Sequence, residues 1–195
     1  QPVVAGNFAG FLAGPGGGYM TRILSTAAGP AGKVYVFASQ PVAREGQPPP
    51  AAPVAAITAD TANYGNVQVV ISNFATIANP EPLDLVWTSQ NYHDMHNPGR
   101  NLDINAANKA ILNALKPGGL YIVLDHQSAK GTEFSADLHR IDEAKVKAEV
   151  LAAGFEFVGS SSVLRNPADD GAKTIFDPGI RGKTDQFILK FKKPG

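Results

Sequence analysis

Short apolar runs alternate with helical patterns along this chain, and this alternation limits the possible folds more than any other feature. Four runs of β-branched and aromatic residues are bounded by turn residues and are predicted to be buried strands: residues 34–38, 67–72, 83–88 and 120–125. Nearly continuous apolar strands are typical of a parallel sheet that is covered on both faces. A weaker run at residues 8–13 is interrupted by Gly10 and is a candidate for a further strand ahead of these.

Helical periodicity lies between the strands. Apolar residues recur at helical spacing over residues 103–115 and 143–153, and a shorter helix is predicted over residues 19–28. Asn101 or Asp103 can cap the first of these helices and Asp142 the second, and Gly154 suits the left-handed residue that follows a helix. Strands that alternate with helices predict right-handed βαβ units, and hence an α/β protein with an open, doubly wound sheet.

The C-terminal part changes character, because the strand candidates at residues 155–164 and 186–191 have no helical pattern between them. Such a pair can lie antiparallel at one edge of the sheet, joined by a long loop. Charged residues of this loop are predicted to form ion pairs that hold it in place, with Arg181 and Asp185 bracketing the entry to the last strand. The set comprises Arg165, Asp169, Asp170, Arg181 and Asp185.

Length and composition indicate one globular domain over residues 1–195, in which the Pro-rich segment 40–66 is a surface loop. A lid or substrate loop is the alternative interpretation of this segment. The 17 basic and 17 acidic residues balance, which gives no reason to expect a nucleic-acid partner. No run approaches the roughly 18 apolar residues of a membrane span, so no membrane partner is expected. The first residue is Gln1, so an exported, periplasmic protein is expected if a leader was removed and a cytoplasmic one otherwise.

A Gly-rich turn lies between the first strand candidate and the first helix. The segment AGPGGGYMTRIL at residues 13–24 places Gly14, Gly16, Gly17 and Gly18 directly ahead of that helix. Glycines let the backbone approach a ligand, and a helix N-terminus offers N–H groups, so a nucleotide-like ligand is predicted. The dinucleotide fingerprint requires a third glycine where Tyr19 stands, which disfavours pyrophosphate binding. A purely structural turn is the alternative interpretation.

Several longer strings resemble known proteins. KPGGLYIVLDH at residues 116–126 and GKVYVFA at residues 32–38 resemble segments of the class I S-adenosylmethionine-dependent methyltransferases. NYHD at 91–94, LHRID at 138–142, LRNPADD at 164–170 and FDPGIRGKTDQFILKFKKP at 176–194 resemble a bacterial family of predicted methyltransferases whose members are often exported. The likeness runs from about Gly14 to the end of the chain and is most specific after Asn91.

This resemblance implies a Rossmann-like, mostly parallel sheet of seven strands whose last strand is antiparallel. It also implies S-adenosylmethionine as the cofactor and methyl transfer to a small molecule. The cofactor is expected at the carboxyl ends of the first strands, with binding residues Gly14, Gly16, Gly17, Gly18, Ser39, Asn73 and Asn91.

Two other functions stay open. Residues 11–14 and 38–40 lack the acidic residues that most class I members place there, which would suit a non-catalytic binding module of the same fold with a degraded cofactor site. A nicotinamide-dependent oxidoreductase is the second alternative, and Tyr19 argues against it.

Polar residues that follow the strand at residues 83–88 are the candidate catalytic group. Asn91 and Tyr92 stand where many amino-methylating relatives line the transfer point, and His93 or Asp94 could act as a general base. The predicted catalytic residues are therefore His93, Asp94 and Tyr92. A loop histidine that bonds only to the backbone is the alternative interpretation of His93. We expect His93 to lie near His126, which ends the next strand, because neighbouring parallel strands end at the same edge of a sheet.

Four polar residues could in principle ligate a metal: His93, Asp94, His126 and His139. No pair of histidines at ligand spacing on one helix supports such a site, and no metal site is predicted.

Overall fold

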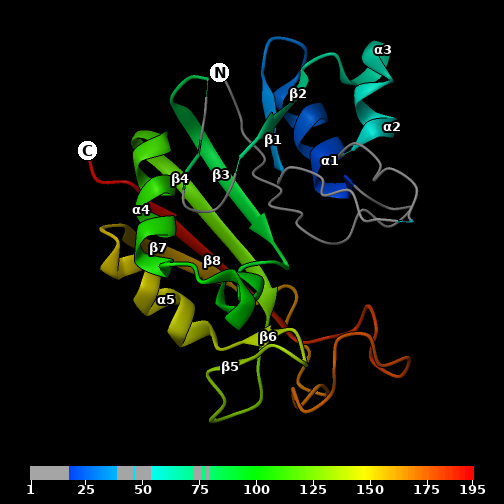
Figure 1. Ribbon diagram of the computed structural model, residues 1–195, viewed down its shortest axis with the longest axis vertical. Helices are drawn as coiled ribbons and strands as arrows, with labels where there is room; N and C mark the ends of the chain where they lie inside the picture. The colour runs from blue at the N-terminus through cyan, green and yellow to red at the C-terminus, as the bar shows by residue number, and fades with distance from the viewer. Residues whose placement is uncertain (1–17, 39–45, 47–53, 73–75, 78–79) are drawn as a thin grey trace.

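Figure 1 shows strands forming the middle of the molecule, with helices packed against both sides. In this computed structural model the described residues are 18–38, 46, 54–72, 76–77 and 80–195. Two strands, β1 (Val34–Ala38) and β2 (Val67–Ile71), form a parallel pair. A four-stranded sheet has the order β3-β4-β8-β7, formed by β3 (Leu83–Ser89), β4 (Leu115–His126), β7 (Glu156–Ser161) and β8 (Gln186–Lys192). The predicted Rossmann-like α/β class is confirmed.

The four-stranded sheet is mixed. β3 and β4 are parallel, whereas β8 runs antiparallel to both of its neighbours, β4 and β7. The antiparallel last strand is therefore confirmed, and β8 lies inside the sheet while β7 occupies its edge. The described residues form a parallel pair and a sheet of four strands rather than one continuous seven-strand sheet. The strand predicted over residues 8–13 lies outside them.

The three longer helices begin and end close to where the sequence predicts. They are α1 (Tyr19–Ala28), α4 (Ile104–Ala114) and α5 (Glu143–Ala152). Asp103 caps α4 by accepting from the backbone N–H of Ala106, and Asp142 caps α5 by accepting from two N–H groups of its first turn. Gly154 follows α5 with a φ of 106°. Among the described residues, no helix is long and apolar enough to cross a membrane.

Two short helices lie within the segment that the sequence predicts to be a Pro-rich loop. They are α2 (Ala55–Thr58) and α3 (Thr61–Tyr64), and Asp60 caps the second. Residues 40–45 and 47–53 of the same segment lie outside the described part of the chain.

Alternate residues of the strands enter two different hydrophobic cores. Tyr35 and Phe37 of β1 pack into the larger core, which also contains residues of α4 and α5, whereas Val36 packs into a smaller core beside α1 and α2. In β3, Val86 belongs to the larger core and Trp87 packs against the smaller one. Because side chains alternate along a strand, β1 and β3 are covered on both faces, as in a doubly wound fold.

The region after β4 folds back over the end of the sheet. A small antiparallel hairpin is formed by β5 (Phe134–Ser135) and β6 (Arg140–Ile141), and the loop at residues 162–185 packs beside it. Arg140 and Asp169 join the two through a buried ion pair of 2.9 Å. Arg165 pairs with Asp185 at 3.0 Å. The predicted pairing of Arg181 with Asp185 is wrong within the described residues, because Arg181 is exposed and Arg165 takes its place.

Candidate functional site

The carboxyl ends of β3 and β4 bring a histidine and an aspartate together. After β3 the chain turns at Gln90, whose φ is 57°, and enters two short 3₁₀-helices, η1 (His93–His96) and η2 (Pro98–Arg100). β4 ends with Asp125 and His126. The Asp125 carboxylate lies 2.7 Å from His93 Nδ1 and also accepts a hydrogen bond of 2.8 Å from the His93 backbone N–H. Asp125 therefore fixes both the position and the ring orientation of His93.

The His93–Asp125 pair is buried, and each partner changes the protonation of the other. Burial is the largest influence on His93 and acts to lower its pKa, but the Asp125 charge and hydrogen bond outweigh it, and the pKa is raised. Burial acts to raise the pKa of Asp125, yet His93 and the surrounding donors lower it. The carboxylate is therefore held ionised beside a ring that binds a proton more readily than usual.

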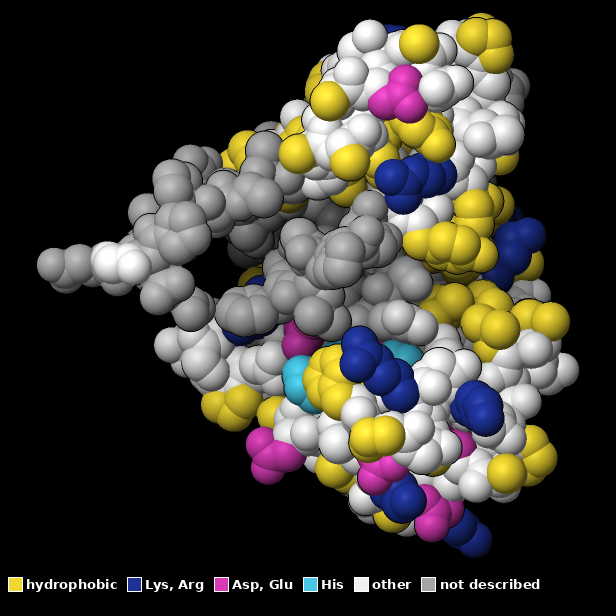
Figure 2. All heavy atoms as spheres, turned by 90° about the vertical axis from the view of Figure 1, so that its right-hand side faces the viewer, with side chains coloured by type: hydrophobic (Ala, Val, Ile, Leu, Met, Phe, Trp, Pro, Cys, Tyr) yellow, Lys and Arg dark blue, Asp and Glu magenta, His cyan; other side chains and the backbone are white. Residues whose placement is uncertain are grey.

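Asp94 and His139 lie on the other side of the His93 ring. Asp94 Oδ1 is 3.6 Å from His93 Nε2 and 4.0 Å from Nδ1 of His139, which the β5–β6 hairpin supplies. The side chains of Asp94 and His139 are 16% and 34% exposed, against 2% for His93. Figure 2 shows histidine side chains reaching the surface of the molecule. His93 is thus buried, whereas Asp94 and His139 beside it are partly exposed.

His126 lies close to His93, as the sequence predicts, but it is directed toward the C-terminal loop. The two ring centroids are 6.3 Å apart. His126 Nδ1 lies 2.8 Å from Thr184 Oγ1, and burial lowers the pKa of His126 to about 4. At neutral pH His126 is therefore an uncharged, hydrogen-bonded residue.

Tyr92, a predicted catalytic residue, is completely buried. Its hydroxyl accepts a 2.8 Å hydrogen bond from Asn108 of α4 and lies 3.1 Å from Glu149 of α5. His96 of η1 contacts the same Glu149 oxygen at 3.1 Å. Burial raises the pKa of Tyr92 well above its ordinary value, so the hydroxyl stays protonated. These contacts attach η1 to both helices.

Most of the predicted cofactor residues lie outside the described part of the chain. Those residues are Gly14, Gly16, Gly17, Ser39 and Asn73. Asn91 is buried at the carboxyl end of β3. Gly18 precedes α1 with a φ of 91°, and a Cβ there would lie 2.2 Å from Ile57 Cδ1. Protein packing and backbone conformation are thus enough to require glycine at this position.

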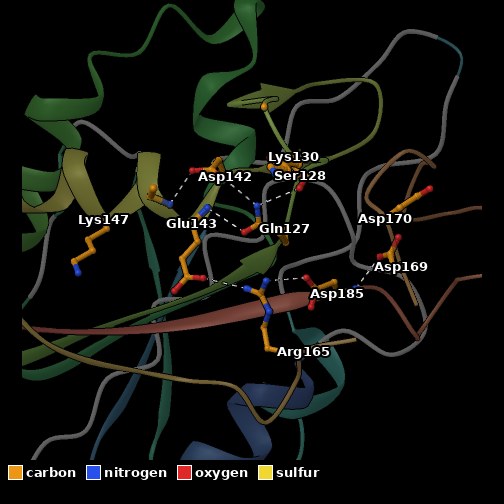
Figure 3. A pocket seen from close by; sticks show the side chains of 12 residues that line it. Gln127, Ser128, Lys130, Asp142, Glu143, Lys147, Arg165, Asp169, Asp170 and Asp185 are labelled. Atoms are coloured by element: carbon orange, nitrogen blue, oxygen red, sulfur yellow. Dashed lines mark hydrogen bonds and ion pairs between the residues drawn. The ribbon is translucent and has the colours of Figure 1, made fainter. Parts of the chain in front are cut away.

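A polar hollow of about 560 Å³ lies next to this group, between the end of β4, the start of α5 and the C-terminal loop (Figure 3). Figure 3 shows Arg165 between Glu143 and Asp185, with ion pairs of 3.0 Å to each. The lining includes neither His93 nor Asp94. Arg165 is paired with two neighbouring carboxylates, which agrees with the structural role expected for the charged residues of the C-terminal loop.

Comparisons with known proteins place this arrangement in a known fold. No protein-family model and no curated protein sequence matches the chain. A S-adenosylmethionine-dependent methyltransferase from Aquifex aeolicus superposes over 98% of this chain and 82% of its own, with a TM-score of 0.61 and 16% identity. The N-methyltransferase NodS from Bradyrhizobium japonicum covers 100% of this chain and 85% of its own, with a TM-score of 0.58 and 13% identity.

The chain has the fold of the S-adenosylmethionine-dependent methyltransferases. At these identities the likeness extends to the fold alone. The [4+2]-cyclase SpnF, at 19% identity and a TM-score of 0.63 over 100% of this chain and 75% of its own, has the same methyltransferase-like fold. A fold shared with a cyclase does not by itself determine the reaction, so the function has to be argued from the site.

Proposed function

We propose that this protein is a S-adenosylmethionine-dependent methyltransferase that acts on a small molecule at the carboxyl ends of β3 and β4. The observation that carries the proposal is the His93–Asp125 pair, 2.7 Å apart, at the sheet edge where open α/β folds bind their ligands. Two neighbours in fold, NodS and the glycopeptide N-methyltransferase MtfA, are methyltransferases, and MtfA has been crystallised with S-adenosylhomocysteine.

The described residues near the expected cofactor are compatible with it. In the described part of the chain no side chain caps the start of α1, and Gly18 brings the backbone to this helix in a left-handed conformation. We propose that backbone N–H groups of the first turn of α1 bind a polar part of the ligand. When bound, S-adenosylmethionine supplies an electrophilic methyl group. We assign its binding to the Gly14 to Gly18 turn, together with Ser39, Asn73 and Asn91.

The role we assign to His93 is to receive the proton that the acceptor loses. Asp125 bonds to Nδ1, which leaves Nε2 as the ring nitrogen that faces Asp94. A buried carboxylate stabilises the imidazolium that forms when Nε2 takes a proton. Asp94 adds a second negative charge on that side. Tyr92 holds η1 against α4 and α5, so it acts by positioning His93.

Calorimetric titration of the full chain with S-adenosylhomocysteine, beside NADH, tests the cofactor assignment. We expect S-adenosylhomocysteine to bind and NADH to give no heat. Gly16→Val should abolish binding, since the added side chain would fill space that the ligand needs. Gly159→Val is the matched control, because a Cβ on Gly159 has no heavy atom within 4 Å. Binding of NADH alone would support the oxidoreductase.

The His93 assignment needs a separate readout. His93→Gln should retain S-adenosylhomocysteine binding and slow methyl transfer by about 10²- to 10⁴-fold, the usual loss for a general base. If the wild-type chain binds S-adenosylhomocysteine but transfers no methyl group to any acceptor in a broad screen of amines, hydroxyls and thiols, the binding module becomes the better interpretation.

A further inference from the structure

We propose that His93, Asp94 and His139 form a binding site for a divalent transition-metal ion, with Zn²⁺ as the cation that fits best. One candidate ligand atom from each of His93, Asp94 and His139 lies within 4.8 Å of the other two. They come from two separate parts of the chain, η1 after β3 and the turn of the β5–β6 hairpin. The fold thus brings three metal-binding atoms to one point.

The spacing of these atoms leaves room for an ion between them. Asp94 Oδ1 lies 3.6 Å from the nitrogen of His93 and 4.0 Å from that of His139. Both distances exceed the roughly 2.7 to 3.2 Å of a hydrogen bond, so the three atoms converge without bonding to one another. In a tetrahedral zinc site, bonds of about 2.0 to 2.1 Å place neighbouring ligand atoms about 3.3 to 3.4 Å apart. A small inward movement of the half-buried side chains of Asp94 and His139 would close the site.

Asp125 prepares His93 to act as a ligand. Metal-bound histidines usually give their other ring N–H to a carboxylate, which fixes the ring orientation and makes the ligating nitrogen more basic. Asp125 occupies this place, 2.7 Å from Nδ1, and is itself fixed by the backbone N–H groups of His93 and His126. Asn97 donates to Asp94 Oδ1 at 3.0 Å. Two of the three proposed ligands therefore have the outer partners of a metal site.

The ring of His139 is also held in place. His139 has a backbone φ of 56°, a left-handed conformation that is uncommon for residues other than glycine. Its ring packs edge-on against Phe176, with centroids 5.0 Å apart, and edge-on against His93 at 5.4 Å. A strained backbone that presents a histidine to this cluster agrees with a functional role.

The ligand set selects the class of cation. Two imidazole nitrogens and one carboxylate suit zinc and neighbouring transition metals, whereas Mg²⁺ and Ca²⁺ prefer oxygen ligands. Separations above 3.5 Å also suit tetrahedral better than octahedral geometry, in which adjacent ligands are about 3 Å apart. Three protein ligands leave a fourth position open for water or an oxygen of a small ligand, as in catalytic zinc sites.

This inference does not depend on methyl transfer. A bound cation would use the same Nε2 lone pair that the proposed function gives to proton transfer, so the cation and the proton would compete for His93. The chain could bind the metal and no S-adenosylhomocysteine, or the reverse. Metal binding and cofactor binding are therefore measured separately.

Titration of the chelator-treated full chain with Zn²⁺ by calorimetry, and with Co²⁺ by visible absorption, tests the site. We expect one ion per chain and the intense absorption of tetrahedral Co²⁺. His139→Ala should weaken binding by at least 100-fold, and Asp125→Asn by about 10- to 100-fold, as for outer partners of other metal sites. His139 is the decisive position because its partly exposed side chain can be removed with little effect on folding.

His96→Gln is the matched control, since His96 is not among the three proposed ligands and a glutamine amide can still donate to Glu149. It should bind Zn²⁺ as tightly as the unmodified chain. The proposal is overturned if the wild-type chain binds no Zn²⁺ at micromolar concentration, or if binding is undiminished in His139→Ala.

Discussion

The guanidinium of Arg140, which is fully buried, donates to both carboxylate oxygens of Asp169 at 2.9 and 3.1 Å. The same side chain donates to the backbone carbonyls of Gln127 and Lys173. Asp169 also accepts from the backbone N–H groups of Gly171 and Asp185. One pair thereby joins the end of β4, the hairpin that carries His139 and the C-terminal loop.

Replacing Asp169 by asparagine should destabilise the protein strongly. The Arg140 charge would stay buried without its counter-ion, and breaking a buried pair in this way costs about 3 to 5 kcal/mol. Urea denaturation gives the measurement. Glu156→Gln is the matched control, because its 3.0 Å pair with Lys192 is exposed and should contribute at most about 1 kcal/mol. Equal effects of the two substitutions would show that Arg140 finds another partner.

The contribution of Asp169 should disappear in acid. Burial acts to raise its pKa, but the Asp185 and Gly171 N–H groups and Arg140 outweigh it, so the pKa is lowered below its ordinary value. A carboxyl with a lowered folded-state pKa stabilises above its unfolded pKa of about 4, and this stabilisation is lost as the pH falls through the folded-state value. The difference in unfolding free energy between wild type and Asp169→Asn should therefore be constant from pH 7 to 5 and shrink below pH 4. A difference that grows in acid would contradict the assignment.

Tyr92→Phe should lower the stability of the folded protein and leave its affinity for S-adenosylhomocysteine unchanged. Without the hydroxyl, the buried Asn108 amide would lose the acceptor of its 2.8 Å hydrogen bond, which costs about 1 to 3 kcal/mol. Thermal unfolding and S-adenosylhomocysteine titration measure the two effects. Tyr64→Phe, at a half-buried tyrosine of α3, is the comparison. Unchanged stability with a large loss of turnover would instead make the Tyr92 hydroxyl part of the chemistry.

Two arginines of the C-terminal loop should differ in importance. Arg165 bridges Glu143 and Asp185 but is itself 36% exposed, so Arg165→Ala should lower the unfolding free energy by about 1 kcal/mol. Arg181 is exposed and forms no ion pair with any described residue. Arg181→Ala should therefore change the unfolding free energy by less than about 0.5 kcal/mol. The reverse order, measured by chemical denaturation, would restore Arg181 as the anchor of the loop.

Local patterns were enough to predict the elements of the fold. The helix over Tyr19–Ala28 and the strand over Val34–Ala38 have the predicted bounds, because periodicity and turn residues act over a few positions. Asp103 and Asp142 were predictable as caps for the same reason. The interior position of β8 was not, since strand order depends on contacts between residues far apart in the chain.

Partners within the site were harder to predict than its location. The sequence indicates that residues after β3 and β4 share one edge, which placed His93 near His126. The sequence does not indicate that Asp125 orients His93. An aspartate at the end of a buried strand could, however, have suggested a partner for a histidine that follows the neighbouring strand. His139 could not be paired with Asp94, because only the path of the β5–β6 hairpin brings them within 4.0 Å.

The place of β8 between β4 and β7 also sets an order of assembly. Ribosomes make β4 and β7 first, and neither can reach its final neighbour until Gln186–Lys192 has emerged. The growing polypeptide therefore carries an unsatisfied strand edge on β4, a surface that invites wrong pairing. Chaperones or translocation machinery that meet the nascent chain would encounter an incomplete sheet. Completion of this sheet therefore waits for β8.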